Sequence, residues 1–294
     1  YPHQAFDGQL DRLRRLGGGM NLAATVGARI PHRRPDAMDF LAYWNATSVQ
    51  VGGGTTLILD DSGHDIHVGR PTSSPEIIVA AAGVHGDSVF LPAYFNPYFA
   101  EQKLGTESLD PRLNFGNEPF TIGRWVKLEA PFQNDASARL LLGRWHTGPG
   151  GAFSDASYAL FYNRTANRYH WAMSSNGTPG GSTAALGPSM AAGAELNWHF
   201  LVGAYDGSTM HFWFDAGVPA TAAHAGGAFA AADAYFSFDY RFGSTGGDND
   251  VSAKVTVNSY MMSAFVLPRM ITQAEVEFLY NSGSRLLYSE TQFA

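Results

Sequence analysis

Two histidines, His64 and His67, have a spacing that zinc-binding loops use. The chain has no cysteine, and no further histidine lies close to this pair. A tetrahedral zinc site therefore lacks its remaining ligands, and we interpret both residues as loop histidines that face solvent. The absence of cysteine also excludes disulfides and thiol nucleophiles.

The motifs of common catalytic centres are missing from the sequence. It contains no Gly-x-Ser-x-Gly elbow, no phosphate-binding loop and no His-Glu-x-x-His pair. Glu275 and Glu277 are close in sequence, but on a helix they would point in different directions. They therefore do not make the facing carboxylate pair that glycoside hydrolysis requires. We predict a protein without catalytic residues, with a polysaccharide hydrolase or lyase as the weaker alternative.

Aromatic residues gather in two loops that also contain glycine or proline, at 92–99 and 145–153. Exposed rings beside polar groups serve glycan sites and protein interfaces alike. The sequence therefore predicts these ligand-binding residues: Tyr98, Trp145, His146 and Phe153. The alternative is that some of these rings cover the ends of the sandwich as core, and for Tyr98 and Trp145 both interpretations stay open. For Trp125 and Trp198 we expect core positions.

The composition is that of a folded domain with a large core. Of 294 residues, 45% are hydrophobic and 15% charged, and the net charge is −7. An acidic surface repels phosphate backbones, so we expect no nucleic-acid partner. No apolar run reaches the roughly 18–20 residues of a membrane helix, so we expect no membrane insertion. Because the chain begins at Tyr1, we expect an N-terminal segment to be missing from this sequence.

Short apolar and aromatic runs, separated by Gly, Asn, Asp and Pro, follow one another from about Asp39 onwards. The clearest runs are 55–59, 76–81, 120–128, 138–145, 158–162, 169–173, 199–205, 210–214, 235–242 and 254–266. Many strands at short spacing predict an all-β fold, an antiparallel two-sheet sandwich. The alternation in 210–214 puts His211 on the outer face of its strand.

Two local signals are sharp. Asp206-Gly207 lies between two apolar runs and predicts a tight hairpin in which this pair supplies the positive φ angles. Thr272 and Glu275 have the spacing of a capping box, which predicts a short helix from Thr272 that Gly283 ends.

The first 38 residues differ from the rest. This segment carries six of the 19 basic residues: Arg12, Arg14, Arg15, Arg29, Arg33 and Arg34. A basic arm on an acidic body predicts docking onto a neighbouring subunit. The alternative is an arm that lies on its own domain.

Five segments in order resemble the laminin-G-like (concanavalin A-like) jelly-roll superfamily of the bacterial or phage type. They are the Tyr43-Trp44 and 60–67 opening, the 83–90 strand, the 120–127 strand with its tryptophan, the 196–217 hairpin and the closing 258–283 segment. The resemblance implies a jelly-roll domain over 39–294, with a short C-terminal helix. The candidate domains are therefore an arm at 1–38 and a sandwich at 39–294.

The resemblance also implies one structural Ca²⁺ near the loop at 60–67. Carboxylates are ligands that calcium prefers, and the candidates are Asp60, Asp61 and Asp65. Relatives often carry paired aspartates in the closing strand, where this chain has Asn258-Ser259. The alternative is that Asp60 and Asp61 cap a turn.

Such domains serve several purposes, so fold alone does not determine function. The arm favours a non-catalytic structural or binding protein that is displayed on an assembly, such as a virion decoration, a tail component or a surface filament. Its partners would be protein neighbours in an oligomer. The alternative is a lectin-like carbohydrate-binding adhesion module. Either reading places the chain on a virion or at the cell surface.

Overall fold

The computed structural model describes residues 38–52, 55–70, 78–83, 86–91, 104–106, 110–129, 138–147, 154–230, 236–238, 259–281 and 291. All of them belong to one compact unit that spans Arg34–Ala294. The basic residues of the arm lie outside the described residues, so their docking stays a prediction.

Sixteen strands are hydrogen-bonded in the described part of the chain, all of them antiparallel. They are β1 (Ala42–Gly52), β2 (Thr55–Asp60), β3 (Val68–Arg70), β4 (Ile78–Gly83), β5 (Gly86–Leu91), β6 (Leu104–Thr106), β7 (Phe120–Leu128), β8 (Ala138–Thr147), β9 (Ser154–Asn163), β10 (Arg168–Gly177), β11 (Ser182–Leu186), β12 (His199–Tyr205), β13 (Thr209–Phe214), β14 (Ala220–Ala223), β15 (Phe236–Phe238) and β16 (Ser259–Leu267).

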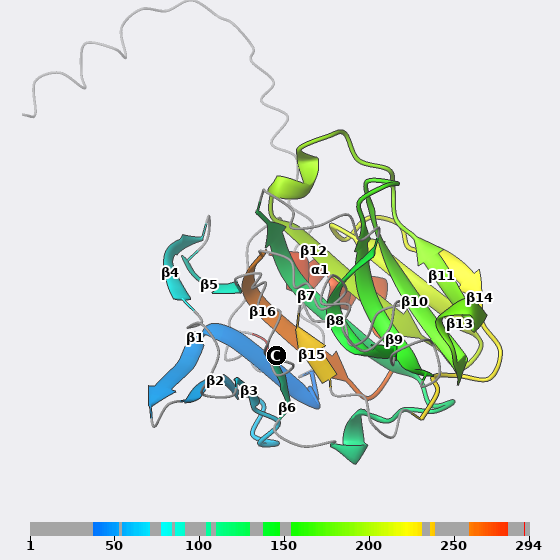
Figure 1. Cartoon of the computed structure of the whole chain (residues 1–294), viewed down its shortest axis with the longest axis horizontal. Helices are drawn as coiled ribbons and strands as arrows, with labels where there is room; N and C mark the ends of the chain where they lie inside the picture. Colours follow the sequence, from blue (N-terminus) through cyan, green and yellow to red (C-terminus); the bar gives the residue numbers. More distant parts are fainter. Residues whose placement is uncertain are drawn as a thin grey trace, which may run out of the picture. The chain divides into compact units, whose positions relative to one another are not determined.

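The strands form two layers, which confirms the predicted sandwich (Figure 1). The order along the hydrogen-bonded path is β11-β10-β9-β8-β15-β6-β3-β2-β1-β16-β7-β12-β13-β14. One layer is built on β8 to β11, and the other on β16, β7 and β12 to β14. β5 pairs with β16 beside β1, and β4 pairs with β5. Strand β16 is therefore bordered on one side by two segments of the N-terminal half.

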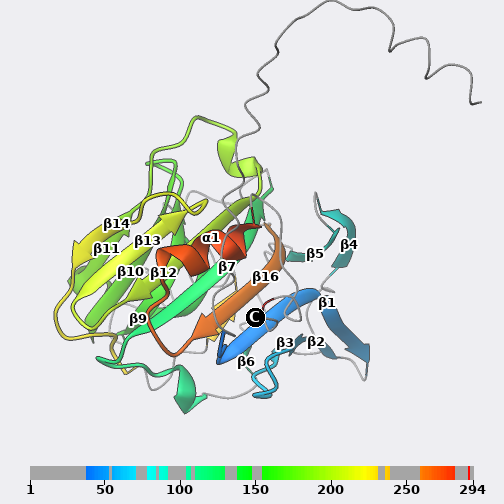
Figure 2. The same cartoon turned by 180° about the vertical axis from the view of Figure 1, so that it is seen from behind.

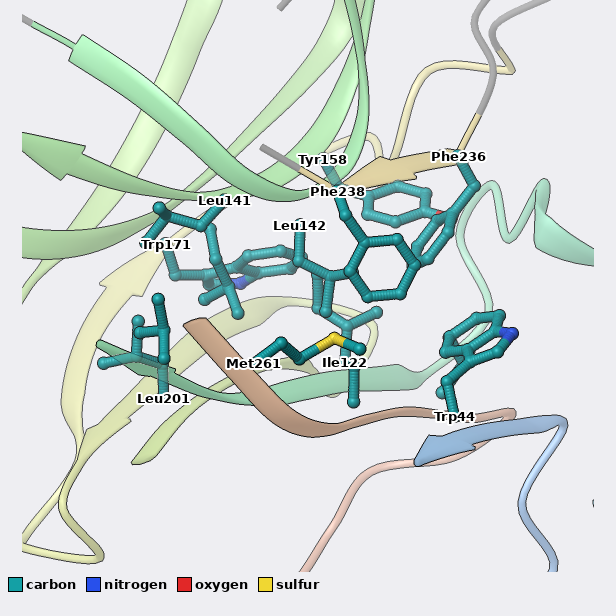
Figure 3. Packing of buried hydrophobic residues seen from close by; sticks show 14 of the residues in the cluster. Trp44, Ile122, Leu141, Leu142, Tyr158, Trp171, Leu201, Phe236, Phe238 and Met261 are labelled. Carbon is teal, nitrogen blue, oxygen red and sulfur yellow. The ribbon is translucent and has the colours of Figure 1, made fainter. Parts of the chain in front are cut away.

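A hydrophobic core fills the space between the layers (Figure 3). Ile122, Leu201 and Met261 enter it from β7, β12 and β16, and the rings of Tyr158 and Trp171 enter it from the opposite layer. All of these side chains are fully buried. Because side chains alternate along a strand, the odd-numbered residues of β12 point into this core and the even-numbered ones point away.

The helix α1 (Gln273–Tyr280) lies over the outer side of β7, β12 and β16 (Figure 2), and a second apolar cluster includes buried residues of these strands and of the helix. Trp125 and Phe200 are buried there, and the ring of Tyr280 stacks on Trp125 at 5.5 Å between ring centroids.

The capping box is confirmed: Thr272 accepts from the Glu275 amide, and Glu275 accepts from the Thr272 amide. The helix ends differently from the prediction, at Tyr280. Asn281 adopts the left-handed conformation with φ 45°, so an asparagine provides the C-cap instead of Gly283.

No helix in the described part of the chain has the length and apolarity to cross a bilayer.

The hairpin between β12 and β13 is confirmed, with one change. Of the pair Asp206-Gly207, only Gly207 has a positive φ, 103°, which suits a turn with glycine at its first central position. Asp206 acts through its side chain, which accepts hydrogen bonds from the amides of Ser208 and Thr209, each at 2.8 Å.

Gly203 in β12 shows how tightly the layers pack. A Cβ at this position would lie 2.5 to 2.9 Å from three atoms of the Trp171 indole, which projects from the opposite layer. These distances are below any ordinary contact, and the indole is fully buried. The glycine therefore makes room for the ring.

We expect Gly203→Ala to lower the free energy of unfolding by roughly 1–3 kcal/mol, because the buried indole must move or strain. Urea denaturation measures the loss. Gly180→Ala is the control, because a Cβ there meets no atom within 4 Å and should change stability by less than about 0.5 kcal/mol. Equal effects at the two positions would contradict the packing argument.

Candidate functional site

The predicted ligand-binding residues are only partly described. Trp145 lies in β8 on the outer side of its layer and is 5% exposed. Its ring meets Phe161 edge-on, with 5.1 Å between centroids. The side chains of Tyr98, His146 and Phe153 lie outside the described residues. The grouping of these four residues stays a prediction, and Trp145 itself is a buried ring.

Asp60, at the end of β2, holds the predicted metal-binding loop together. One carboxylate oxygen accepts hydrogen bonds from the amides of Tyr43 and Ser62, both at 2.9 Å. The other accepts from the Ser62 hydroxyl at 2.8 Å and from the Ile66 amide at 3.1 Å. The backbone amide of Asp60 donates to Nδ1 of His67 at 3.0 Å. The carboxylate thereby ties β1 to the loop that follows β2.

The other two candidate ligands point elsewhere. Asp61 accepts a hydrogen bond from the Ser48 hydroxyl at 2.6 Å, and burial raises the pKa of its carboxyl although this bond opposes the shift. Asp65 is exposed. Among the described residues, no three acidic or histidine side chains gather closely enough to hold a metal ion. This arrangement does not fit a preformed calcium site, whereas it does fit the turn-capping alternative for Asp60. Calcium binding stays a prediction.

We expect Asp60→Ala to lower the free energy of unfolding by roughly 2–4 kcal/mol, because buried amides lose their acceptor. If Asp60 acts only as a hydrogen-bond acceptor, the free energy of unfolding should fall by the same amount in buffer with calcium and in buffer with a chelator. Asp65→Asn is the control, since an exposed asparagine tolerates the left-handed backbone at φ 58° and should change little. A loss that appears only in calcium would show that Asp60 is a metal ligand.

His199, at the start of β12, is an ion-paired histidine near one end of the sandwich. Its Nδ1 lies 2.8 Å from an Asp215 carboxylate oxygen, and its Nε2 lies 2.9 Å from the Ala194 carbonyl oxygen. Since both neighbours are acceptors, the arrangement favours the imidazolium form, in which both nitrogens donate. Burial lowers the pKa of His199, but the bond and charge of Asp215 outweigh it, so the pKa is raised overall.

A raised pKa in the folded state means that His199 stabilises the fold at acidic pH. That contribution is complete below the unfolded pKa of about 6.5, and it is lost as the pH rises through the folded-state pKa. We expect the stability difference between the wild type and His199→Gln to shrink as the pH rises from about 5.5 to 9. Urea denaturation across this range measures it. A pH-independent difference would contradict the ion-paired state.

The most distinctive surface feature is a row of half-buried side chains on the outer side of one layer. Tyr260 in β16 lies opposite Phe90 in β5 on one side and Lys127 in β7 on the other. The pairing of Val126 with His199 places Trp198 next in line after Lys127. We call these four residues, Phe90, Tyr260, Lys127 and Trp198, the aromatic row.

The rings of the aromatic row contact one another. Phe90 and Tyr260 lie 4.9 Å apart between centroids, and Trp198 meets Tyr260 edge-on at 6.4 Å. The Lys127 ammonium lies 5.4 Å from the centre of the Tyr260 ring, within cation–π range. All four side chains retain intermediate exposure. The row therefore offers aromatic surface, and a charged group, to a molecule that arrives from solvent.

Glu129, just after β7, supplies a carboxylate to the same face. One of its oxygens accepts a hydrogen bond from the Tyr260 hydroxyl at 3.2 Å. Burial raises the pKa of Tyr260, and the neighbouring Glu129 charge raises it further. Tyr260 therefore stays neutral over the physiological range and keeps its hydroxyl oriented towards Glu129.

The sequence alone does not predict this row. The predicted core position is confirmed for Trp125 but not for Trp198, which the structure leaves partly exposed at the edge of the cluster beneath α1. The available signal was alternation: Lys127 follows Trp125 by two positions and so shares its outer face. Phe90 and Tyr260 come together only through the pairing of β5 with β16, which no local pattern predicts.

The fold resembles those of several solved binding domains. The botulinum neurotoxin serotype G binding domain matches with a TM-score of 0.54 and 10% identity over 83% of this chain and 51% of that chain. The serotype D binding domain matches with 0.54 and 8% over 83% and 52%. The binding domain of Paraclostridial Mosquitocidal Protein 1 matches with 0.52 and 13% over 82% and 52%.

These likenesses concern the β-sandwich fold. The chain spans about half the length of the solved chains that it matches. No protein-family model matches the sequence, and no curated protein does so. The laminin-G-like assignment within the sandwich folds therefore stays a prediction.

Proposed function

We propose that this chain is a non-catalytic binding domain that recognises a glycan through the aromatic row. The observation that carries the proposal is the alignment of three half-exposed rings, from β5, β16 and the residue before β12, on one outer face. Separate segments of the chain converge there, so the rings are held by the sheet itself. A rigid scaffold of this kind positions a binding surface before the ligand arrives.

The chemistry of the row suits a sugar. The apolar C–H face of a pyranose packs on aromatic rings, and its hydroxyls require polar partners beside those rings. Lys127 can donate hydrogen bonds, and Glu129 can accept them, on the same face as the rings. A protein partner would use similar rings, so binding of a protein in place of a glycan is an outcome that the test below distinguishes.

The described carboxylates support a role without catalysis, because several of them have structural partners. Asp60 organises a turn, Asp215 pairs with His199, and Glu275 pairs with Arg269 at 2.6 Å while it caps α1. The three solved structures described above are themselves named as binding domains. A surface or extracellular location, on a virion or a cell, is part of the proposal.

Assembly through the basic arm is a second proposal, and it rests on the cluster of six arginines before residue 36. It is compatible with glycan binding by the sandwich. Deletion of residues 1–37, which keeps the buried Met38, should convert an oligomer to a monomer in light scattering. An unchanged oligomer would remove the proposed role of the arm.

We expect a glycan array to show selective binding, and Trp198→Ala and Phe90→Ala to weaken it. Loss of one ring should cost about 1–2 kcal/mol, or roughly 5- to 30-fold in affinity. Leu186→Ala is the control, since Leu186 is 49% exposed on β11, in the other layer. Melting temperatures of all variants show whether the fold is intact.

Two results would overturn the proposal. One is an array without binding by the intact chain. The other is glycan binding that survives both ring deletions in folded variants. Binding of a protein to the aromatic row, with no glycan bound, would assign the row to a protein interface.

A further inference from the structure

We infer that the glycan recognised by the aromatic row is an acidic sugar, whose carboxylate or sulfate group pairs with Lys127. This inference rests on the proposed function. Lys127 lies inside the row, and its ammonium faces the Tyr260 ring at 5.4 Å. Among the described residues, no carboxylate forms an ion pair with this ammonium.

Three other described cations in this acidic chain have carboxylate partners, whereas Arg168, like Lys127, forms no ion pair among the described residues and donates to the Ser189 hydroxyl at 2.6 Å. The chain has 26 acidic and 19 basic residues. Arg112 pairs with Asp110 and Arg269 pairs with Glu275, each at 2.6 Å, and His199 pairs with Asp215. Lys127 differs from Arg168 in its position, because its ammonium lies over the Tyr260 ring inside the aromatic row. This ammonium attracts an anion from outside the chain.

Glu129 lies close enough to bond Tyr260, yet it does not take the place of that anion. Its carboxylate is directed to the Tyr260 hydroxyl, 3.2 Å away. The row therefore presents an ammonium and a carboxylate as separate groups on one face. A sugar acid complements both, because its anionic group pairs with Lys127 while its hydroxyls donate to Glu129. Glu129 is negatively charged and repels the anionic end of the sugar, so it also fixes the orientation of the sugar on the row.

Two other ligand classes fit less well. A cationic ligand would seek the face of Tyr260, where Lys127 already provides the cation, and it would be repelled by that charge. A neutral sugar would stack on the rings but would cover the ammonium without giving it a counter-charge. Covering an unpaired charge costs free energy, which an acidic sugar avoids.

The test compares sugars that differ only in charge. Isothermal titration would use glucuronic acid oligomers, the same oligomers after reduction of their carboxyl groups, and sulfated forms of the reduced oligomers. We expect the acidic forms to bind roughly tenfold more tightly than the neutral form at low salt. The preference should fall as the salt concentration rises, because the charges are partly exposed. The carboxylated and sulfated arms identify which anion the row prefers.

Lys127→Met should bring the affinity for the acidic oligomer down to that for its neutral partner, whereas Lys127→Arg should keep the preference. Arg164→Met is the matched control. It removes one exposed positive charge from the turn between β9 and β10, in the other layer, and should leave the preference intact. If Arg164→Met lowers the preference for the acidic oligomer as much as Lys127→Met does, the preference comes from net charge, and the inference is overturned.

The outcomes separate the inference from the function on which it rests. Equal binding of acidic and neutral oligomers, weakened by Trp198→Ala, would overturn the acidic-sugar inference and leave glycan binding in place. A preference that persists in Lys127→Met would also overturn it. No binding to any oligomer, together with a blank glycan array, would overturn both.

Discussion

The burial of one sheet on both faces is the constraint on which most of this structure depends. In β7 and β12, Val126 and Leu201 point into the sandwich, while Trp125 and Phe200 point outward beneath α1. Strands with two buried faces read as continuous apolar runs instead of alternating ones. They also leave no room for a ligand at their centre. A binding surface on this layer must therefore lie where the cover of α1 stops.

The aromatic row occupies that place. Trp198 still packs against the cluster beneath α1, and Tyr260 and Phe90 continue the same outer face onto β16 and β5. Each ring of the row therefore packs against the protein on one side and is partly exposed to solvent on the other. The polar groups lie on this same outer face because Lys127 and Glu129 follow Trp125 at intervals of two along β7 and its end.

The sequence predicts most of this fold because its signals are local. The strands 120–128 and 199–205 agree with the predicted runs residue for residue, and the capping box of α1 lies where Thr272 and Glu275 indicated. Helix termination was less predictable, because asparagine and glycine both adopt the left-handed cap. The candidate site was harder still. Its members meet through strand pairing between distant segments, and the residue type of Trp198 does not distinguish a buried ring from a partly exposed one.

Asp60 illustrates the same limit. From the sequence, an acidic residue before a turn is equally compatible with a metal ligand and with a hydrogen-bond acceptor. Only the positions of the Tyr43 and Ile66 amides show that the carboxylate is already engaged by the protein. Asp60 therefore serves the fold, by joining β1 to the loop that follows β2.

The exposure of Trp198 gives the molecule a built-in optical reporter. The chain has six tryptophans, and the other five, Trp44, Trp125, Trp145, Trp171 and Trp213, are at most 5% exposed. A water-soluble quencher such as iodide therefore reaches one indole in preference to the others, and that indole belongs to the aromatic row. The quenchable part of the emission reports the occupancy of this surface, without any label, while the unquenched part reports the integrity of the core.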